Sequence, residues 1–142
     1  MRRILCVILA VSGLVLSCTR PDTFEKFVPA PGTEDNIYLF DIDLSDSTSL
    51  YDVSFYTKVD TPVVKPKQQE SFKMHIFWVS PSDVRFEETV YYPSWETVVP
   101  YRTGVKVSEA GEWRLAIQLT DPPKGLRGLG VIVKRKEHHG TR

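Results

Sequence analysis

The sequence predicts an all-β protein: an antiparallel β-sandwich of the jelly-roll or immunoglobulin-like kind, preceded by a signal peptide and an extended tether. After residue 36, apolar and polar residues alternate with a period of two in most segments, which is the pattern of half-buried strands. Clusters of proline, glycine and serine separate these segments. Beyond the N-terminal apolar run, no window repeats apolar residues at the spacing of an amphipathic helix.

The first seventeen residues have the pattern of a lipoprotein signal peptide. Arg2 and Arg3 precede an uncharged apolar run over residues 4–16. As a helix, this run would rise only about 20 Å, which is short of the roughly 30 Å hydrocarbon core of a bilayer. A cleaved signal peptide therefore fits better than a permanent membrane span. The run ends in Val-Leu-Ser-Cys, which resembles a bacterial lipobox, so Cys18 is the predicted lipid attachment site and membrane anchor.

The composition of the mature chain excludes several classes of function. Cleavage before Cys18 leaves 125 residues, which is the size of one domain with a single core. Loss of Arg2 and Arg3 leaves sixteen basic against eighteen acidic residues, a net charge of minus two, which gives no support to nucleic-acid binding. Cys6 is removed with the signal peptide, so the mature chain has no second cysteine for a disulfide or a thiolate metal cluster.

Residues 18–36 are predicted to form the lipidated N-terminus and a proline-rich tether. Pro21, Pro29 and Pro31 disfavour a helix, because proline lacks an N–H group. Phe24 and Phe27 are apolar and give part of this arm a surface that can pack onto the domain.

The sandwich domain is predicted over residues 37–136, with a flexible tail over residues 137–142. Strands are expected over residues 37–44, 51–59, 72–79, 84–90, 105–107, 113–120 and 129–134. A tight turn is expected at residues 81–83. The strand at 84–90 has the weakest pattern, because Glu88 lies on its apolar side.

No catalytic or metal-binding constellation stands out. Asp41, Asp43 and Asp46 have a spacing compatible with a surface cation site, but the glycine and terminal glutamate of an EF-hand loop are missing. We interpret them as the end of a strand that leads into a turn. The glycines of residues 125–130 lack the strand–loop–helix order of a phosphate loop and are expected to permit a bend or bulge. We expect no enzymatic activity, no cofactor and no metal.

The strongest candidate for recognition is the aromatic segment over residues 91–101. Tyrosine and tryptophan combine a flat apolar face with a polar group, which suits sugar rings and protein hot spots. Tyr91, Tyr92 and Trp95 are therefore the predicted ligand or partner contacts. In the alternative interpretation, Trp95 and Tyr101 fill the open edge of the sandwich.

Four short motifs resemble the gliding-motility lipoprotein family (GldH-like) of the Bacteroidota. They are YDVSFYTKVD from residue 51, HIFW from residue 75, Gly-Glu-Trp ending at Trp113, and LRGLGVIV from residue 126. Together with the lipobox, they span most of the mature chain.

This resemblance implies a non-enzymatic envelope lipoprotein that serves as an interaction or assembly factor for a gliding-motility or secretion-type apparatus. Its partners would be other envelope proteins, and only the lipid-bearing cysteine carries over, as Cys18. The residues after Cys18 lack an acidic cluster that resembles a surface-export signal, so we expect the outer membrane, facing the periplasm. The alternative function is a carbohydrate-binding lipoprotein that uses Tyr91, Tyr92 and Trp95.

Overall fold

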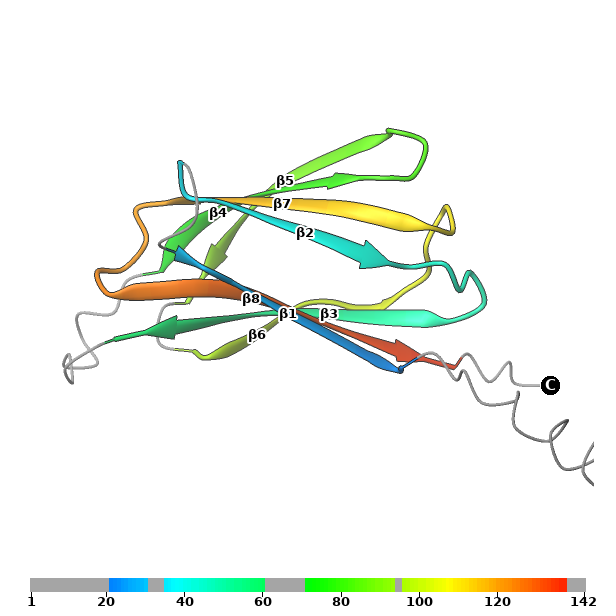
Figure 1. Ribbon diagram of the computed structural model, residues 1–142, viewed down its shortest axis with the longest axis horizontal. Coiled ribbons are helices and arrows are strands. Elements are labelled where there is room, and N and C mark those ends of the chain that lie inside the picture. Colours follow the sequence, from blue (N-terminus) through cyan, green and yellow to red (C-terminus); the bar gives the residue numbers. More distant parts are fainter. Residues whose placement is uncertain (1–20, 31–34, 61–70, 94–95, 138–142) are drawn as a thin grey trace, which may run out of the picture.

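The computed structural model describes residues 21–30, 35–60, 71–93 and 96–137 and folds them into eight β-strands (Figure 1). The strands are β1 (Thr23–Pro29), β2 (Ile37–Asp43), β3 (Leu50–Val59), β4 (Phe72–Val79), β5 (Arg85–Tyr92), β6 (Val98–Val105), β7 (Glu112–Thr120) and β8 (Leu126–Lys136). None of the described residues belongs to a helix that is long and apolar enough to span a bilayer. The signal peptide, Cys18, Trp95 and residues 138–142 lie outside the described residues.

The strands form two antiparallel four-stranded sheets that pack face to face. One sheet has the order β1-β8-β3-β6 and the other has the order β2-β7-β4-β5. The pairs are β1 with β8, β2 with β7, β3 with β6 and β4 with β5. This set of pairs is the jelly-roll arrangement. The predicted sandwich is confirmed, and of the two topologies named from the sequence the jelly roll is the one formed.

The core lies between the two sheets and comes from the alternating residues that the sequence pattern placed inside. In β2 the exposure alternates strictly, with Tyr38, Phe40 and Ile42 buried. Facing side chains from the inner strands of the two sheets complete the core: Tyr51, Val53, Phe55, Met74, Ile76, Leu115, Ile117, Leu129 and Val131. β5 and β6, the edge strands on one side of the sandwich, are more exposed than these inner strands.

The predicted domain boundary at residue 37 is wrong, because the sandwich begins at Thr23. Residues 23–29 form β1, which pairs with β8 along its whole length, from Thr23 opposite Lys134 to Pro29 opposite Gly128. Of the predicted tether, residues 23–29 are therefore part of a sheet.

The strand predicted at residues 105–107 is also misplaced. β6 runs over Val98–Val105 and pairs with β3 through two register shifts. Pro100 and Gly104, whose φ is 64°, interrupt the regular alternation of apolar and polar residues in this strand. The sequence pattern therefore did not predict β6. The turn expected at residues 81–83 is confirmed, with the Asp83 amide donating to the Ser80 carbonyl oxygen at 3.0 Å.

Two glycines of β8 make room for aromatic rings on the outer face of the first sheet. A Cβ at Gly130 would collide with the ring of Tyr56, and a Cβ at Gly128 would lie 2.5 Å from the ring of Phe27. The rings of Phe27 and Tyr56 stack on each other with centroids 5.8 Å apart. The expected bulge lies beside Gly128, where the pairing of β8 with β3 shifts register.

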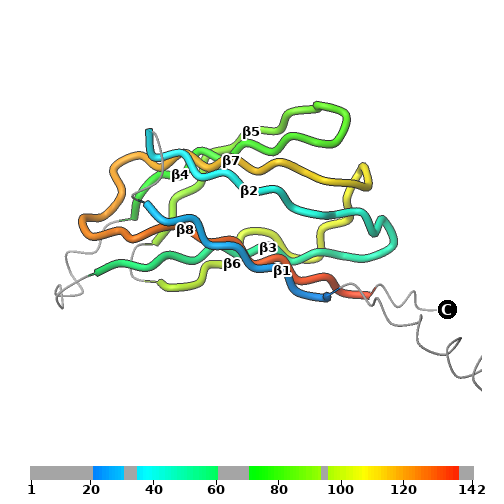
Figure 2. Tube along the Cα trace, viewed as in Figure 1, coloured from blue at the N-terminus to red at the C-terminus, as the bar shows by residue number. Residues whose placement is uncertain are grey.

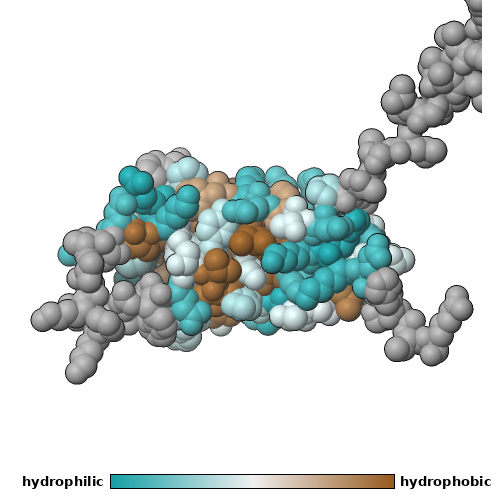
Figure 3. All heavy atoms as spheres, turned by 90° about the horizontal axis from the view of Figure 1, so that it is seen from below, coloured by the Kyte–Doolittle hydropathy of each residue, from teal (hydrophilic) through white to brown (hydrophobic). Residues whose placement is uncertain are grey.

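Seen from below, the molecule has small apolar areas among hydrophilic ones (Figure 3).

The described chain enters and leaves the sandwich at the same end, which we call the terminal end (Figure 2). Thr23 of β1 lies opposite Lys134 of β8 there. Antiparallel pairing brings the connections at residues 44–49, 80–84 and 106–111 to this end as well. The opposite edges of the sandwich differ, because β1 and β2 contact each other whereas the β5–β6 side contains a cavity.

Candidate functional site

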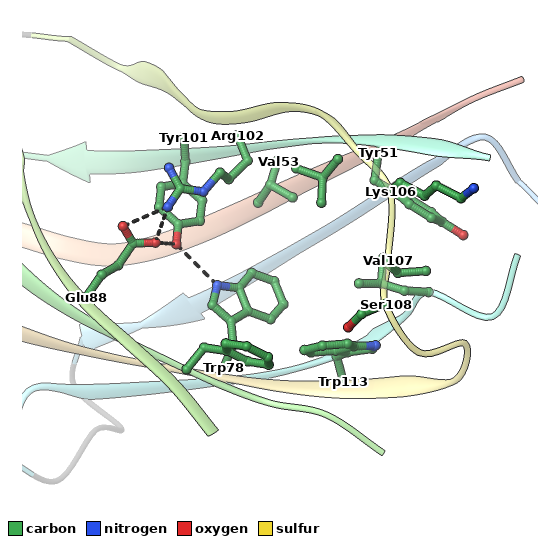
Figure 4. Close-up of a pocket in the computed structure, with 13 residues that line it drawn as sticks. Tyr51, Val53, Trp78, Glu88, Tyr101, Arg102, Lys106, Val107, Ser108 and Trp113 are labelled. Carbon is green, nitrogen blue, oxygen red and sulfur yellow. Dashed lines mark hydrogen bonds and ion pairs between the residues drawn. The ribbon is translucent and has the colours of Figure 1, made fainter. Parts of the chain in front are cut away.

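A cavity of about 310 Å³ opens between β5 of one sheet and β6 of the other, in the half of the sandwich nearer the terminal end (Figure 4). β5 and β6 are edge strands of opposite sheets, and side chains fill the space between them only in part. Its lining combines large apolar side chains with a few polar ones: Leu44, Tyr51, Val53, Trp78, Phe86, Glu88, Tyr101, Arg102, Val105, Lys106, Val107, Ser108 and Trp113.

A chain of hydrogen bonds crosses the cavity from one sheet to the other. The indole Nε1 of Trp78 on β4 donates to the Tyr101 hydroxyl at 3.3 Å, and that hydroxyl donates to the carboxylate of Glu88 on β5. Arg102 Nη2 donates to both carboxylate oxygens of Glu88, at 2.6 and 2.7 Å. Figure 4 shows these side chains converging from three strands.

Tyr101 is held from several sides. Its ring packs on Phe55, with centroids 4.8 Å apart, and the guanidinium of Arg102 lies 4.6 Å from its centroid, within the range of a cation–π contact. Burial, together with the Glu88 carboxylate, raises the pKa of Tyr101 to about 12. The hydroxyl is therefore protonated at neutral pH and acts as a neutral hydrogen-bond donor.

The other end of the cavity is mainly aromatic, with Ser108 near Trp113 and Lys106 near Tyr51 (Figure 4). The ring of Trp113 on β7 stacks with Phe86 at 5.9 Å and meets Trp78 edge-on at 6.3 Å. Trp113 is buried and its Nε1 donates to the Glu109 carbonyl oxygen at 2.9 Å, whereas Phe86 is 49% exposed. Phe86 is thus a half-exposed aromatic side chain that packs on the buried, hydrogen-bonded Trp113.

This arrangement suits binding of an apolar group. Trp78, Tyr101, Glu88 and Arg102 already satisfy one another's hydrogen bonds, and the Trp113 indole is satisfied by the backbone. Besides these groups, Lys106 and Ser108 are the polar residues of the lining, so a ligand rich in hydroxyl groups would find few partners, and each hydroxyl buried without one costs free energy. An apolar side chain or ring would instead replace water against aromatic surface.

The structure separates two of the predicted contact residues. Tyr91 and Tyr92 are neighbours on β5, so they point to opposite faces of the sheet. Tyr91 is 67% exposed, whereas Tyr92 is 2% exposed, stacks on Phe72 at 5.1 Å and donates to the Thr97 carbonyl oxygen at 3.0 Å. The expectation that both rings meet one ligand is therefore corrected, because Tyr92 belongs to the core. Trp95 and the lipid site Cys18 lie outside the described residues.

Asp41 lies on β2 opposite Arg114, whereas Asp43 and Asp46 accept the hydrogen bonds of the turn that follows. Asp43 accepts from the Ser45 amide at 3.0 Å. Asp46 accepts from the Thr48 amide and from the Thr48 and Ser49 hydroxyls, and these hydrogen bonds lower its pKa to about 2. Within the described ranges, no group of three or more His, Cys, Asp or Glu side chains is placed to hold a metal ion.

The cavity residues were not singled out together by the sequence, although one sign of them was visible. Glu88 breaks the apolar side of its strand, and a charge on an inward position is the kind of exception that marks a polar partner inside. That partner, the Tyr101 and Arg102 pair, lies on a strand of the other sheet, so no local pattern connects them.

The comparisons with known proteins bear on the fold. The chain matches no family model, and no curated protein matches it in sequence. A protein of Sulfurospirillum deleyianum known from its crystal structure is similar, with a TM-score of 0.50 and 7% identity over 83% of this chain and 99% of that chain. This similarity supports the two-sheet fold. Because a fold does not determine a function, the function has to be inferred from the residues of the cavity.

Proposed function

We propose that this protein is a non-enzymatic envelope lipoprotein that acts as an interaction or assembly factor. The observation that supports this most is the open, largely apolar cavity between β5 and β6. A concave apolar site with a few oriented polar groups is the usual form of a binding site. Because Tyr101 and Arg102 both donate to Glu88, this part of the lining is oriented before a ligand enters, which reduces the cost of binding.

The location in the envelope is supported by the sequence. The lipobox ending at Cys18 supports attachment to a membrane, and the residues after it favour the periplasmic side of the outer membrane. The resemblance to gliding-motility lipoproteins supports a role in a gliding or secretion-type apparatus, with envelope proteins as partners.

Site-specific photo-crosslinking in the native envelope tests this function. A photoreactive amino acid at Phe86, half-exposed at the cavity, should give a discrete adduct with an envelope protein, and the same group at Leu39 should not. Leu39 is a matched control, because it is 63% exposed on β2 at the far edge of the same sheet. Equal adducts from both positions, or none from either, would contradict an interaction factor that uses this cavity.

A carbohydrate-binding lipoprotein is the second candidate, and the exposed ring of Tyr91 favours it. Tyr91→Ala and Trp95→Ala should then weaken binding to cell-wall or surface glycans while the domain remains folded. Leu39→Ala removes an equally exposed apolar side chain from the same sheet and should leave glycan binding unchanged. Glycan binding that neither aromatic substitution alters would exclude this candidate.

A further inference from the structure

We propose that the cavity takes one large apolar side chain of an extended partner segment, which adds to the sandwich as a strand along the free edge of β5. This deepens the proposed function, on which it rests, because it names the form in which a partner binds. Two independent observations carry it: the chemistry of the cavity and the state of the strand edge beside it.

The first observation is that β5 presents an unpaired edge. In the described part of the chain, β5 pairs with β4 alone and forms the end of its sheet. Every other residue of such a strand offers an N–H and a C=O group to a further strand. Its pairing with β4 is regular from Arg85 to Tyr92, without a register shift.

The other sheet edges are less suited to an added strand. β6 contains Pro100, which has no N–H group, as well as the left-handed Gly104 and two register shifts. β1 and β2 contact each other, so each covers part of the edge of the other. β5 thus combines a regular edge with an adjacent apolar cavity.

The second observation is that the cavity lies directly beneath this edge. Phe86 and Glu88 are inward-facing residues of β5 and both line the cavity. Side chains of an added strand would alternate between the two faces of the sheet, so every second one would be aimed at the cavity. Strand addition commonly works in this way, with main-chain hydrogen bonds for affinity and a pocket for alternate side chains.

The chemistry of the lining selects the side chain. Trp78, Phe86 and Trp113 offer aromatic surface, and Trp78, Tyr101, Glu88 and Arg102 hydrogen-bond to one another. Phenylalanine, tryptophan or leucine would gain the most from this surface, whereas burial of a charged side chain against the rings would cost desolvation. An acyl chain would use the cavity but not the edge, and a sugar would meet a mostly apolar lining.

The test uses synthetic strands and the full lipidated protein in phospholipid nanodiscs. The probes are nine-residue peptides of alternating threonine and valine with lysine at both ends and phenylalanine, leucine or tryptophan at the centre. NMR follows the indole N–H signals of Trp78 and Trp113 and the exchange protection of β5 amides, with β1 amides as the internal control. At least one peptide should shift both indole signals saturably and protect β5 but not β1.

Matched peptides separate the two parts of the proposal. An alanine at the centre should weaken binding at least about tenfold, because it removes the buried side chain. N-methylation of alternate peptide amides should weaken it similarly, because it removes the donors to the edge. Equal binding of the alanine peptide or of the N-methylated peptides would overturn the proposal, as would the absence of saturable shifts with all three central residues.

Two further probes identify competing occupants, and one protein variant checks the site. Laurate or maltotriose that shifts the indole signals where the peptides do not would overturn the proposal in favour of a lipid or a sugar site. Val107→Phe should fill the cavity and abolish peptide binding, and Leu39→Phe should not. An envelope adduct from Phe86 without peptide binding would overturn only this inference, whereas peptide binding without any adduct would overturn only the proposed function.

Discussion

Glu88 is the residue at which the local pattern and the tertiary structure conflict most informatively. An inward-facing carboxylate would weaken a sandwich core if it were left alone. Here its strand lies at a sheet edge, and Tyr101 and Arg102 of the opposite sheet both donate to it. Since both members of the Glu88–Arg102 ion pair are partly exposed, the pair contributes little to stability, and its main effect is to orient Tyr101.

Tyr101 predicts a dependence of stability on alkaline pH. Its pKa of about 12 in the folded protein lies above the ordinary value of 10.0, so the stability it contributes is complete below about pH 10 and is lost as pH rises toward 12. Tyr101→Phe should flatten this loss in urea unfolding measured between pH 8 and 11. Tyr56, whose pKa burial also raises to about 12, should account for part of the remaining slope.

The control for this prediction is an exposed tyrosine. Tyr91→Phe changes a ring that is 67% exposed and should leave the curve of stability against pH unchanged. Parallel curves of stability against pH for Tyr101→Phe and the unsubstituted protein would show that Tyr101 does not cause the loss of stability at alkaline pH.

At the scale of elements, β8 shows how a strand can be shaped by its neighbours. Gly128 and Gly130 leave space that the rings of Phe27 and Tyr56 fill, a pairing of glycine with an aromatic ring that supports twisted sheets. The two rings come from β1 and β3, the two strands that flank β8. The glycines thus serve packing across three strands.

Gly130→Ala should destabilise the protein by about 1–3 kcal/mol, because the added methyl group collides with the Tyr56 ring and overpacks the site. In a Tyr56→Ala background the same substitution should cost much less, since the ring is gone. Urea unfolding of the four proteins of this double-mutant cycle measures the coupling. An additive pair would show that the ring and the glycine do not depend on each other.

We expect that removal of β1 destabilises the domain. A protein that begins at residue 37 would lose the strand that covers β8, including the partly buried Phe24 and Val28. It should lose on the order of 2 kcal/mol of stability, because complete burial of an apolar side chain contributes about 1.5–3 kcal/mol and these two are partly buried. Thermal unfolding, compared with a protein that begins at residue 21, measures the loss. Equal stability of the two proteins would mean that β1 is only an accessory strand.

At the scale of the whole molecule, β1 changes how the domain relates to its predicted anchor. Four residues separate Cys18 from Thr23, and the five steps between these two residues span at most about 18 Å. A lipid on Cys18 would therefore hold the terminal end of the sandwich close to the bilayer. The cavity lies in this half of the molecule, within reach of partners at the membrane surface.

The anchor itself is tested by Cys18→Ala, which should move the protein from the membrane fraction to the soluble fraction. Two or more acyl chains give stable attachment, and without them little remains to hold the domain. Cys6→Ala is the matched control, because Cys6 lies in the predicted signal peptide and its loss should not alter fractionation. Unchanged membrane partitioning of Cys18→Ala in immunoblots of the two fractions would refute the lipoprotein assignment.

The sequence by itself determined the class of the fold and most of its strands. The alternation in β2, β3, β4 and β7 depends only on near neighbours in the chain, because successive side chains of a strand point to opposite faces. It also determined the turn at residues 81–83, where local backbone chemistry suffices. For the same reason, the opposite directions of Tyr91 and Tyr92 follow from their adjacency once they lie on a strand.

Only the tertiary structure decided the position of β1, the course of β6 and the cavity. β1 has an irregular exposure pattern and becomes a strand through pairing with β8, about a hundred residues later in the chain. The cavity depends on Trp78, Glu88 and Tyr101 meeting across two sheets. The physical reason is that a strand's period encodes which side chains share a face, whereas long-range pairing decides which faces and edges meet.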